Sequence, residues 1–327
     1  MRRLVKEFTA QLTEALEIGI NTNLNAPKNK INNVVITGLG GSGIGGKIAT
    51  QLVADQMQIP AIINNDYRLP LFVNENTLVI VSSFSGNTEE TLEALQAAQK
   101  AKAEIACITS GGKLAQIAKD HKYNLLVLPK AFSPRAMLTY SVIQQLFLFH
   151  HYGFINNQFI NDTKATVALL NAEENNIIST AKKTANSLFE KTTVAYSEAS
   201  MEGVITRFRQ QINENSKSLG WEHVFPEMNH NELVGWAGGK EEYAVVIFRS
   251  SFEHPRSSVR IDISKDIFKK YTSTVLEFKA KGDTFLAQSF YHILLGDWIS
   301  VYLAELNEVD DVEVKVIDFL KAELAKI

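Results

Sequence analysis

The chain has one cysteine in 327 residues, so an internal disulfide is excluded. Cys107 lies in the apolar run EIACIT, and no basic residue stands beside it in the sequence to stabilise a thiolate. This setting predicts a small buried strand residue rather than a nucleophile. A chain without disulfides suits a reducing compartment, and we expect a cytoplasmic protein.

An excess of positive charge is also lacking. The chain has 33 lysines and arginines against 36 aspartates and glutamates, which gives a formal net charge of -3. We therefore expect neither nucleic acid nor a membrane surface as principal partner, while a local phosphate site stays open. No apolar stretch approaches the length of a membrane span without charges, and the N-terminal MRRLVKEFTAQL lacks the uninterrupted apolar segment of a signal peptide.

What the sequence has is a regular alternation of short β-branched runs and amphipathic segments. Its length and its 45% of hydrophobic residues are enough for the cores of two ordinary domains. The alternation predicts parallel sheets that are covered on both faces by helices. In the first half, a leading helix at 4–18 precedes strands at 34–37, 61–64, 78–83, 104–109 and 124–129, with helices at about 44–54 and 88–102, a short helix ending near 118, and a helix at 136–151.

The second half repeats this order after a polar segment at 153–164. We place the domain boundary there, which predicts domains at 1–153 and 154–327. The fold class is α/β, with two doubly wound domains. After a helix that runs to 189, we expect strands at 192–197, 243–248 and 273–278, and helices at 207–219, 257–268, 284–306 and 314–326.

A glycine-rich loop, GLGGSGIGGK at 38–47, joins the first strand to its helix. Glycines let backbone N–H groups approach an anion, and a helix N-terminus adds a favourable dipole. The loop also contains G-x-G-x-x-G, so a dinucleotide site with Asp66 on the ribose is an alternative. A Walker loop is excluded, because Ile48 stands where that motif needs serine or threonine.

A second loop, VSSFSGNTEETL, follows a later strand and again opens a helix. Ser83, Ser85 and Thr88 offer three hydroxyls around the flexible Gly86, whereas capping a helix needs only one such residue. Together with Ser42 of the first loop, they suit the several acceptor oxygens of a phosphate monoester. The two loops therefore predict a phosphate site.

A third stretch, RFRQQINENSKSLGWEHVFPEMNHNELVGW at 207–236, has the densest polar cluster of the chain. Its first part predicts a helix that carries Glu214, with Phe208, Ile212 and Leu219 on its apolar stripe and Gly220 as its stop. The part after it has no strand or helix period. It is typical of a site loop, with a polar surface turn as the alternative, and its polar residues are Glu227, Asn229, His230, Asn231 and Glu232.

The motifs GLGGSG and SSFSGNTEET resemble the sugar isomerase (SIS) domain, a doubly wound module that binds phosphosugars. A narrower likeness rests on further motifs, namely NENSK, PEMNHNELVGW, SPRAML and GDWISVYLAEL with IDFLK. Together they resemble the bifunctional phosphoglucose/phosphomannose isomerase family, which has two SIS domains in one chain. The resemblance covers nearly the whole length and implies two SIS-type domains.

The resemblance also implies a role for individual residues. Glu214 would be the base that moves a proton between C1 and C2, and His230 would assist ring opening. Arg135 would lie beside the enediolate, and Lys321 would approach the ring-opening end. A homodimer is implied too, with the histidine contributed by the neighbouring subunit. The substrate phosphate would be held by Gly41, Ser42, Ser83, Ser85 and Thr88.

The implied reaction interconverts glucose 6-phosphate and mannose 6-phosphate with fructose 6-phosphate through a cis-enediol(ate). It needs a carboxylate with a raised pKa and a histidine that titrates near neutrality, but no metal and no cofactor. Histidine and cysteine patterns at metal spacing are absent from the sequence, in agreement with this. A non-catalytic phosphosugar-binding SIS protein and an NAD-dependent dehydrogenase are the alternatives.

Overall fold

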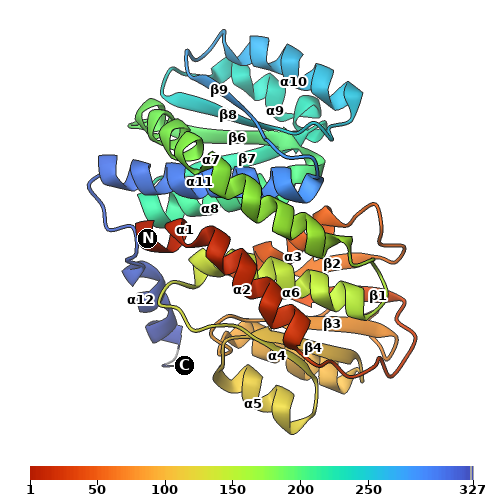
Figure 1. The fold of residues 1–327 in the computed structure, drawn as a ribbon. Coiled ribbons are helices and arrows are strands. Elements are labelled where there is room, and N and C mark those ends of the chain that lie inside the picture. Colours follow the sequence, from red (N-terminus) through yellow and green to blue (C-terminus); the bar gives the residue numbers. More distant parts are fainter. Residues whose placement is uncertain (325, 327) are drawn as a thin grey trace. The chain divides into compact units, whose positions relative to one another are not determined.

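The structure is a computed structural model that describes residues 1–324 and 326 (Figure 1). It contains two compact units, one formed by Lys6–Asn171 and the other by Met1–Val5 together with Ala172–Ile327. The division falls within helix α7 (Gln158–Leu188). A domain boundary after residue 153 stays a prediction.

The unit at 6–171 is built on a five-stranded parallel sheet with the order β2-β1-β3-β4-β5. Every residue of β3 and β4 is buried, which explains why their sequences are continuous apolar runs. The order confirms the predicted alternation of strand and helix. The strands are β1 (Asn33–Thr37), β2 (Ala61–Asn64), β3 (Thr77–Ser82), β4 (Glu104–Thr109) and β5 (Asn124–Val127).

Helices cover both faces of this sheet (Figure 1). The helices α4 (Glu89–Lys100) and α5 (Gly112–Asp120) share one apolar core with the strand residues Val35, Val79 and Cys107. Neighbouring strand residues face opposite sides, and the side chain of Ile36 meets Gly46 of α3 (Gly40–Leu52) on the other face. The helix α3 packs with α6 (Leu138–His151), which also contacts α2 (Phe8–Asn21).

Cys107 lies inside this core, as the sequence predicts. Its side chain is fully buried on β4. Burial raises the pKa of the Cys107 thiol to about 12, because a thiolate would lose its hydration. The thiol is therefore protonated at neutral pH and packs as a small apolar group.

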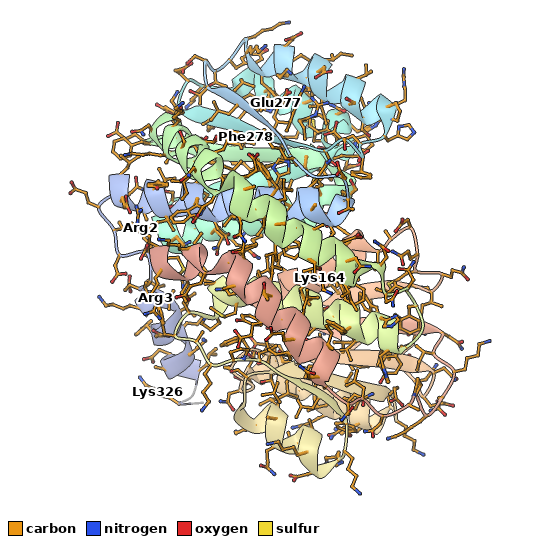
Figure 2. The ribbon with its side chains drawn as sticks, viewed as in Figure 1. Arg2, Arg3, Lys164, Glu277, Phe278 and Lys326 are labelled. Atoms are coloured by element: carbon orange, nitrogen blue, oxygen red, sulfur yellow. The ribbon has the colours of Figure 1, made fainter. Side chains whose placement is uncertain are left out.

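The second unit has a four-stranded parallel sheet with the order β7-β6-β8-β9. Along β9, Glu277 and Phe278 point to opposite faces, where Phe278 meets Phe248 with ring centres 5.9 Å apart and Glu277 accepts a hydrogen bond from Lys265 (Figure 2). The strands are β6 (Thr192–Glu198), β7 (Gly220–Phe225), β8 (Tyr243–Arg249) and β9 (Val275–Lys279).

Two long helices and one shorter helix cover this sheet. On one face, α8 (Glu202–Ser216) packs against α11 (Phe285–Leu306). On the other face, α10 (Pro255–Phe268) shares a core with β6, β7 and β8. Among the described residues, no helix is both long and apolar enough to cross a membrane. The remaining elements are α1 (Arg2–Lys6), η1 (Pro134–Met137), η2 (Ala199–Met201), η3 (Glu227–His230), α9 (Glu232–Gly235), η4 (Trp236–Gly238) and α12 (Lys315–Leu324).

Two expected element bounds are wrong. The helix expected at 44–54 begins at Gly40, so most of the glycine loop is its first turns. The helix expected at 207–219 ends at Ser216, because Lys217 turns into the left-handed region with a φ of 55°. Leu219 lies outside the helix with 85% of its surface exposed, and the next residues form β7, which the sequence did not predict. This strand is mostly half-buried with charged side chains, so it lacks an apolar run.

Buried polar contacts fix α8 against α11. The Arg207 guanidinium pairs with the Asp297 carboxylate at 2.7 Å, and both side chains are almost fully buried. One residue before the end of α8, the Asn215 side chain donates to the Ser300 hydroxyl at 2.9 Å. Such contacts are only satisfied at one register of the two helices, so they position the end of α8.

His292 of α11 is a buried histidine that the structure keeps neutral. Its Nε2 lies 2.9 Å from the Arg249 carbonyl oxygen, while its buried Nδ1 has no partner among the described residues. Burial lowers the pKa of His292 to about 4, because a charged ring would be desolvated.

The lowered pKa predicts a pH-dependent stability. The unfolded chain binds a proton at His292 below about pH 6.5, whereas the folded chain does so only below about 4. The free energy of unfolding should therefore fall by about 3 kcal/mol from this group as the pH drops through this window. We expect His292→Gln to flatten the profile by this amount in urea titrations between pH 7 and 4, and the exposed His121→Gln to leave it unchanged. Parallel profiles for wild type and His292→Gln would contradict the assignment.

Candidate functional site

The two hydroxyl loops leave the same edge of the sheet at 6–171. Strands β1 and β3 are neighbours and parallel, and the chain leaves β1 toward β2 on one side and β3 toward β4 on the other. In a doubly wound sheet, this reversal opens a crevice at the carboxyl ends of the two strands, where ligands bind. The loop after β1 and the loop after β3 border this point.

Hydrogen bonds join the two loops. The Phe84 backbone N–H donates to the Ser42 hydroxyl at 3.2 Å, and the Gly86 N–H donates to the Ser83 hydroxyl at 3.1 Å. The Ser83 and Thr88 hydroxyls lie 2.9 Å apart. Thr88 is the N-cap of α4, but its side chain makes no capping hydrogen bond. The structure thus brings Ser42, Ser83 and Thr88 to one edge, and the Thr88 hydroxyl is not used for capping.

Backbone hydrogen bonds from the turn after β4 hold the second loop in place. The Ser110 N–H donates to the Phe84 carbonyl and the Leu114 N–H to the Gly86 carbonyl, each at 2.9 Å. Ser85 is exposed on the outer side of the loop, where its hydroxyl accepts from the Asn87 N–H at 3.3 Å. The loop is therefore preorganised, with Ser85 open to solvent.

Gly41 and Arg135 lie at the same edge. A Cβ placed on Gly41 would be 3.6 Å from the Arg135 Cα, so η1 packs against the first turn of α3. Arg135 has only 7% of its surface exposed. The helix N-termini that follow the two loops favour an anion. The structure thus gathers Arg135 with the phosphate-loop residues.

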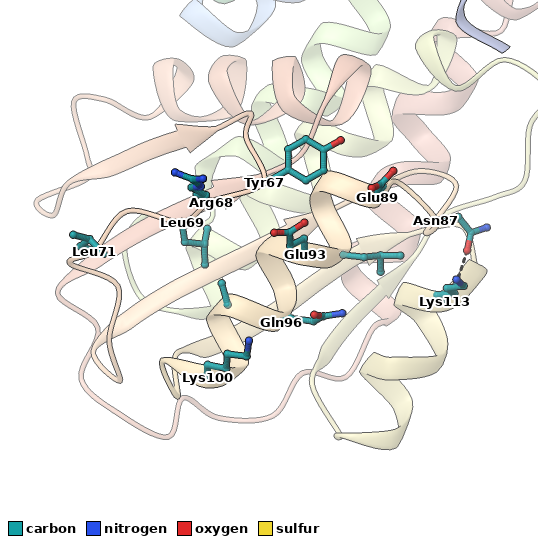
Figure 3. A pocket seen from close by; sticks show the side chains of 12 residues that line it. Tyr67, Arg68, Leu69, Leu71, Asn87, Glu89, Glu93, Gln96, Lys100 and Lys113 are labelled. Carbon is teal, nitrogen blue, oxygen red and sulfur yellow. Dashed lines mark hydrogen bonds between the residues drawn. The ribbon is translucent and has the colours of Figure 1, made fainter. Parts of the chain in front are cut away.

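A surface pocket of 630 Å³ opens on the outer side of α4 and does not match the predicted phosphate site (Figure 3). Its lining includes the carboxylates of Glu89 and Glu93 as well as Asn87, whose side chain accepts from the Lys113 N–H at 3.0 Å. None of the predicted phosphate residues lines it. Its lining has the cations Arg68, Lys100 and Lys113 beside the two carboxylates, so charge alone does not exclude an anion there. The phosphate site at the β1–β3 edge stays a prediction that rests on the loop residues.

The second unit has an equivalent switch point between β6 and β8, but carboxylates fill it. The Glu198 carboxylate accepts the His254 N–H and the Ser200 hydroxyl, both at 2.9 Å. The Ser250 N–H donates to the Glu253 carboxylate at 3.0 Å. Fixed carboxylates at this position repel an anion, so this switch point is unsuited to phosphate.

Glu214 lies in the last turn of α8 and is half-buried. The asparagines on either side of Glu214 make structural hydrogen bonds. Asn213 donates to the Ser218 carbonyl at 2.8 Å, and Asn215 holds Ser300 of α11. The NEN motif therefore fixes the backbone on both sides of the carboxylate.

The loop after β7 is held by the polar residues that surround His230. The Glu232 carboxylate accepts from the Tyr196 hydroxyl and from the Trp221 indole N–H, the latter at 3.1 Å. Asn229 donates to the Ser264 hydroxyl at 2.9 Å. Asn231 donates to the Glu227 carboxylate at 2.9 Å, whereas the exposed His230 ring has no hydrogen-bond partner among the described residues.

Glu214 and His230 lie at opposite ends of the strands of their sheet. Glu214 is near the end of α8, just before β7 begins at Gly220, whereas His230 follows the end of β7 at Phe225. Six strand residues span about 20 Å. The structure thus does not bring these two residues together within one chain. Lys321 is exposed on α12.

Comparisons with known proteins agree with this architecture. Residues 29–152 match the SIS domain family, and residues 177–324 match the bacterial phospho-glucose isomerase C-terminal SIS domain. Among solved structures, the C-terminal domain of glucosamine-fructose-6-phosphate aminotransferase from Francisella tularensis superposes with a TM-score of 0.76 at 13% identity, covering 95% of this chain and 98% of that one. The chain is a tandem SIS-domain protein, as its motifs predict.

Two relatives narrow the assignment. The bifunctional phosphoglucose/phosphomannose isomerase of Caldicellulosiruptor bescii is 41% identical, over 99% of this chain and 98% of the relative. The enzyme of the same name from Aquifex aeolicus is 35% identical, over 90% of each chain. The chain belongs to the bifunctional phosphoglucose/phosphomannose isomerase family, which confirms the family resemblance of its sequence.

The loop geometry makes Gly86 a sharp test of the phosphate site. Gly86 has a φ of +69°, and a Cβ there would lie 1.9 Å from the Gly111 carbonyl oxygen. We expect Gly86→Ala to cost at least about 2 kcal/mol of unfolding free energy and to abolish the rise in melting temperature caused by inorganic phosphate. Gly153 is the matched control, since its φ is +76° but no described atom lies within 4 Å of a Cβ there.

Gly153→Ala should cost only about 1 kcal/mol and keep the response to phosphate. An equal response to phosphate in both variants would contradict the assignment of the loop.

Proposed function

We propose that this chain is an aldose–ketose isomerase that interconverts fructose 6-phosphate with glucose 6-phosphate and mannose 6-phosphate. One observation carries the proposal. Two hydroxyl-bearing loops meet at a single switch point, in a chain of a family whose members are named phosphoglucose/phosphomannose isomerases. Hydroxyls, backbone N–H groups and two helix N-termini form a site for the phosphate that all three sugars share.

The phosphate is held by Gly41, Ser42, Ser83, Ser85 and Thr88. With the phosphate fixed, the sugar end of the substrate is oriented for proton transfer. Glu214 takes a proton from the carbon next to the carbonyl and returns it to the neighbouring carbon, so that a cis-enediol(ate) forms in between. The permanently charged Arg135 stabilises the oxygen on which negative charge develops.

Hexose phosphates are mainly cyclic, so the ring must open before the proton moves. An imidazole can exchange a proton at neutral pH, and we assign His230 to ring opening, with Lys321 at the same end of the substrate. The reaction needs neither a redox cofactor nor a metal, since the proton removed from one carbon is returned to the next.

A homodimer is part of the proposal. Glu214 and His230 are separated by about the length of β7 in one chain, so one chain does not present both to the same hexose. A second copy can supply the histidine, in an arrangement with two equivalent composite sites. We also propose that residues 1–153 form the phosphate-binding domain and residues 154–327 the domain that bears Glu214 and His230.

The base is tested by substitution. Glu214→Gln keeps the size of the side chain but cannot accept a proton, so we expect kcat to fall by about a hundredfold to ten-thousandfold with KM nearly unchanged. The exposed Glu242→Gln is the matched control and should keep full activity. The measurement is the conversion of fructose 6-phosphate, with glucose 6-phosphate and mannose 6-phosphate measured separately, with and without EDTA.

Loss of activity in EDTA would contradict a metal-independent mechanism. If the wild-type protein makes neither aldose while fructose 6-phosphate still raises its melting temperature, the chain is a phosphosugar-binding protein and the isomerase proposal is wrong.

The shared site is tested by mixing two inactive variants. In a dimer of one Glu214→Gln chain and one His230→Ala chain, one composite site has both native residues and the other has neither. After unfolding and refolding of a one-to-one mixture, random pairing should restore about a quarter of wild-type activity. If the mixture stays as inactive as either variant, the histidine does not come from a second copy.

A further inference from the structure

We propose that Lys217 is a positioning residue that anchors the proposed base Glu214 and the helix bearing Lys321 to one another. The inference deepens the proposed function and rests on it for the role of Glu214. Lys217 is the residue directly after α8 and the last residue of the NENSK motif, in which only Glu214 has a proposed role.

The ammonium of Lys217 is fully coordinated by backbone carbonyls. Its Nζ donates to the carbonyl oxygens of Glu214 at 2.7 Å, Asp310 at 2.7 Å and Glu313 at 2.8 Å. An ammonium has three N–H donors, so each of them is used. Because the acceptors come from two segments about a hundred residues apart in sequence, the side chain joins these segments.

The first of these contacts acts on Glu214 itself. The last carbonyls of a helix have no partner within the helix, and the Glu214 carbonyl is one of them. A positive charge at this end also interacts favourably with the helix dipole. The ammonium therefore holds the backbone from which the Glu214 carboxylate extends.

The other two contacts fix the segment that leads to α12. Asp310 forms a turn in this segment, because its carboxylate accepts the Val312 N–H at 2.8 Å and the Glu313 N–H at 3.2 Å. These hydrogen bonds lower the pKa of Asp310. Two residues later α12 begins at Lys315. None of the ten residues of α12 is buried, so packing against its own unit does not orient the helix. The segment before α12 is attached by Lys217 and by an ion pair at 3.0 Å between the Met1 ammonium and the Asp311 carboxylate.

The backbone of Lys217 is in the left-handed region. A residue with a φ of 55° at a helix end is most favourable as glycine, and a side chain there costs about 1 kcal/mol. Lys102 is a matched case, with a φ of 57° after α4, and its ammonium has no hydrogen-bond partner among the described residues. The two lysines share the backbone conformation and differ in their contacts.

This pair provides the experiment. Lys217→Gly removes the ammonium while giving the left-handed position its preferred residue, so the variant should fold as stably as wild type. We expect kcat for fructose 6-phosphate to fall about tenfold to a hundredfold, because a displacement of about 1 Å at a catalytic group has this effect. KM should change less than about twofold, since the phosphate loops are intact. Lys102→Gly should leave both constants unchanged.

Hydrogen exchange gives a readout that does not depend on activity. We expect amides at 310–324 and at the end of α8 to exchange at least tenfold faster in Lys217→Gly than in wild type or Lys102→Gly. Unchanged exchange at 310–324, or a kcat equal to that of Lys102→Gly, would overturn the inference. A wild-type protein without isomerase activity would instead refute the proposed function, and the exchange data would still decide whether Lys217 anchors α12.

Discussion

The parallel pairing of β1 with β3 is the constraint on which the candidate site depends. The chain leaves these adjacent strands in opposite directions, so their carboxyl ends cannot both be covered by the same crossover. The glycines after β1 and the hydroxyls after β3 thereby become neighbours although they are more than forty residues apart in sequence, as the bond from Phe84 to Ser42 shows. A helix begins directly after each loop, so the same topology also supplies the dipoles that favour an anion.

The sequence predicted those features whose cause is local. Strands such as β3 and β4 are continuous apolar runs because both of their faces are buried, and the hydroxyl loop after β3 is visible as a motif. The exposed and half-buried β7 was missed for the opposite reason. Its sequence GWEHVF mixes charged and apolar residues at a sheet edge, and the left-handed turn at Lys217 that precedes it has no glycine to mark it.

For the candidate site, too, the sequence predicted the candidate residues but not the contacts that hold them. Glu214 and His230 stand out by composition, but the sequence cannot show that most polar side chains around them hold the backbone, as Asn213, Asn215 and Glu232 do. Nor can it show Lys217 spanning to Asp310 and Glu313, because contacts between distant segments depend on the whole packing of α8 against α11. Such contacts carry no sequence signature of their own.

The carboxylates at the β6–β8 edge give the two SIS modules unequal chemistry. At the β1–β3 edge the N–H groups of Phe84 and Gly86 donate to neutral serine hydroxyls, whereas at the β6–β8 edge the carboxylates of Glu198 and Glu253 accept the equivalent bonds. The second module thus has carboxylates of its own at the position where a ligand anion would bind. Although the fold is duplicated, the fixed charge at the switch point is not, and a carboxylate at this position repels a phosphate.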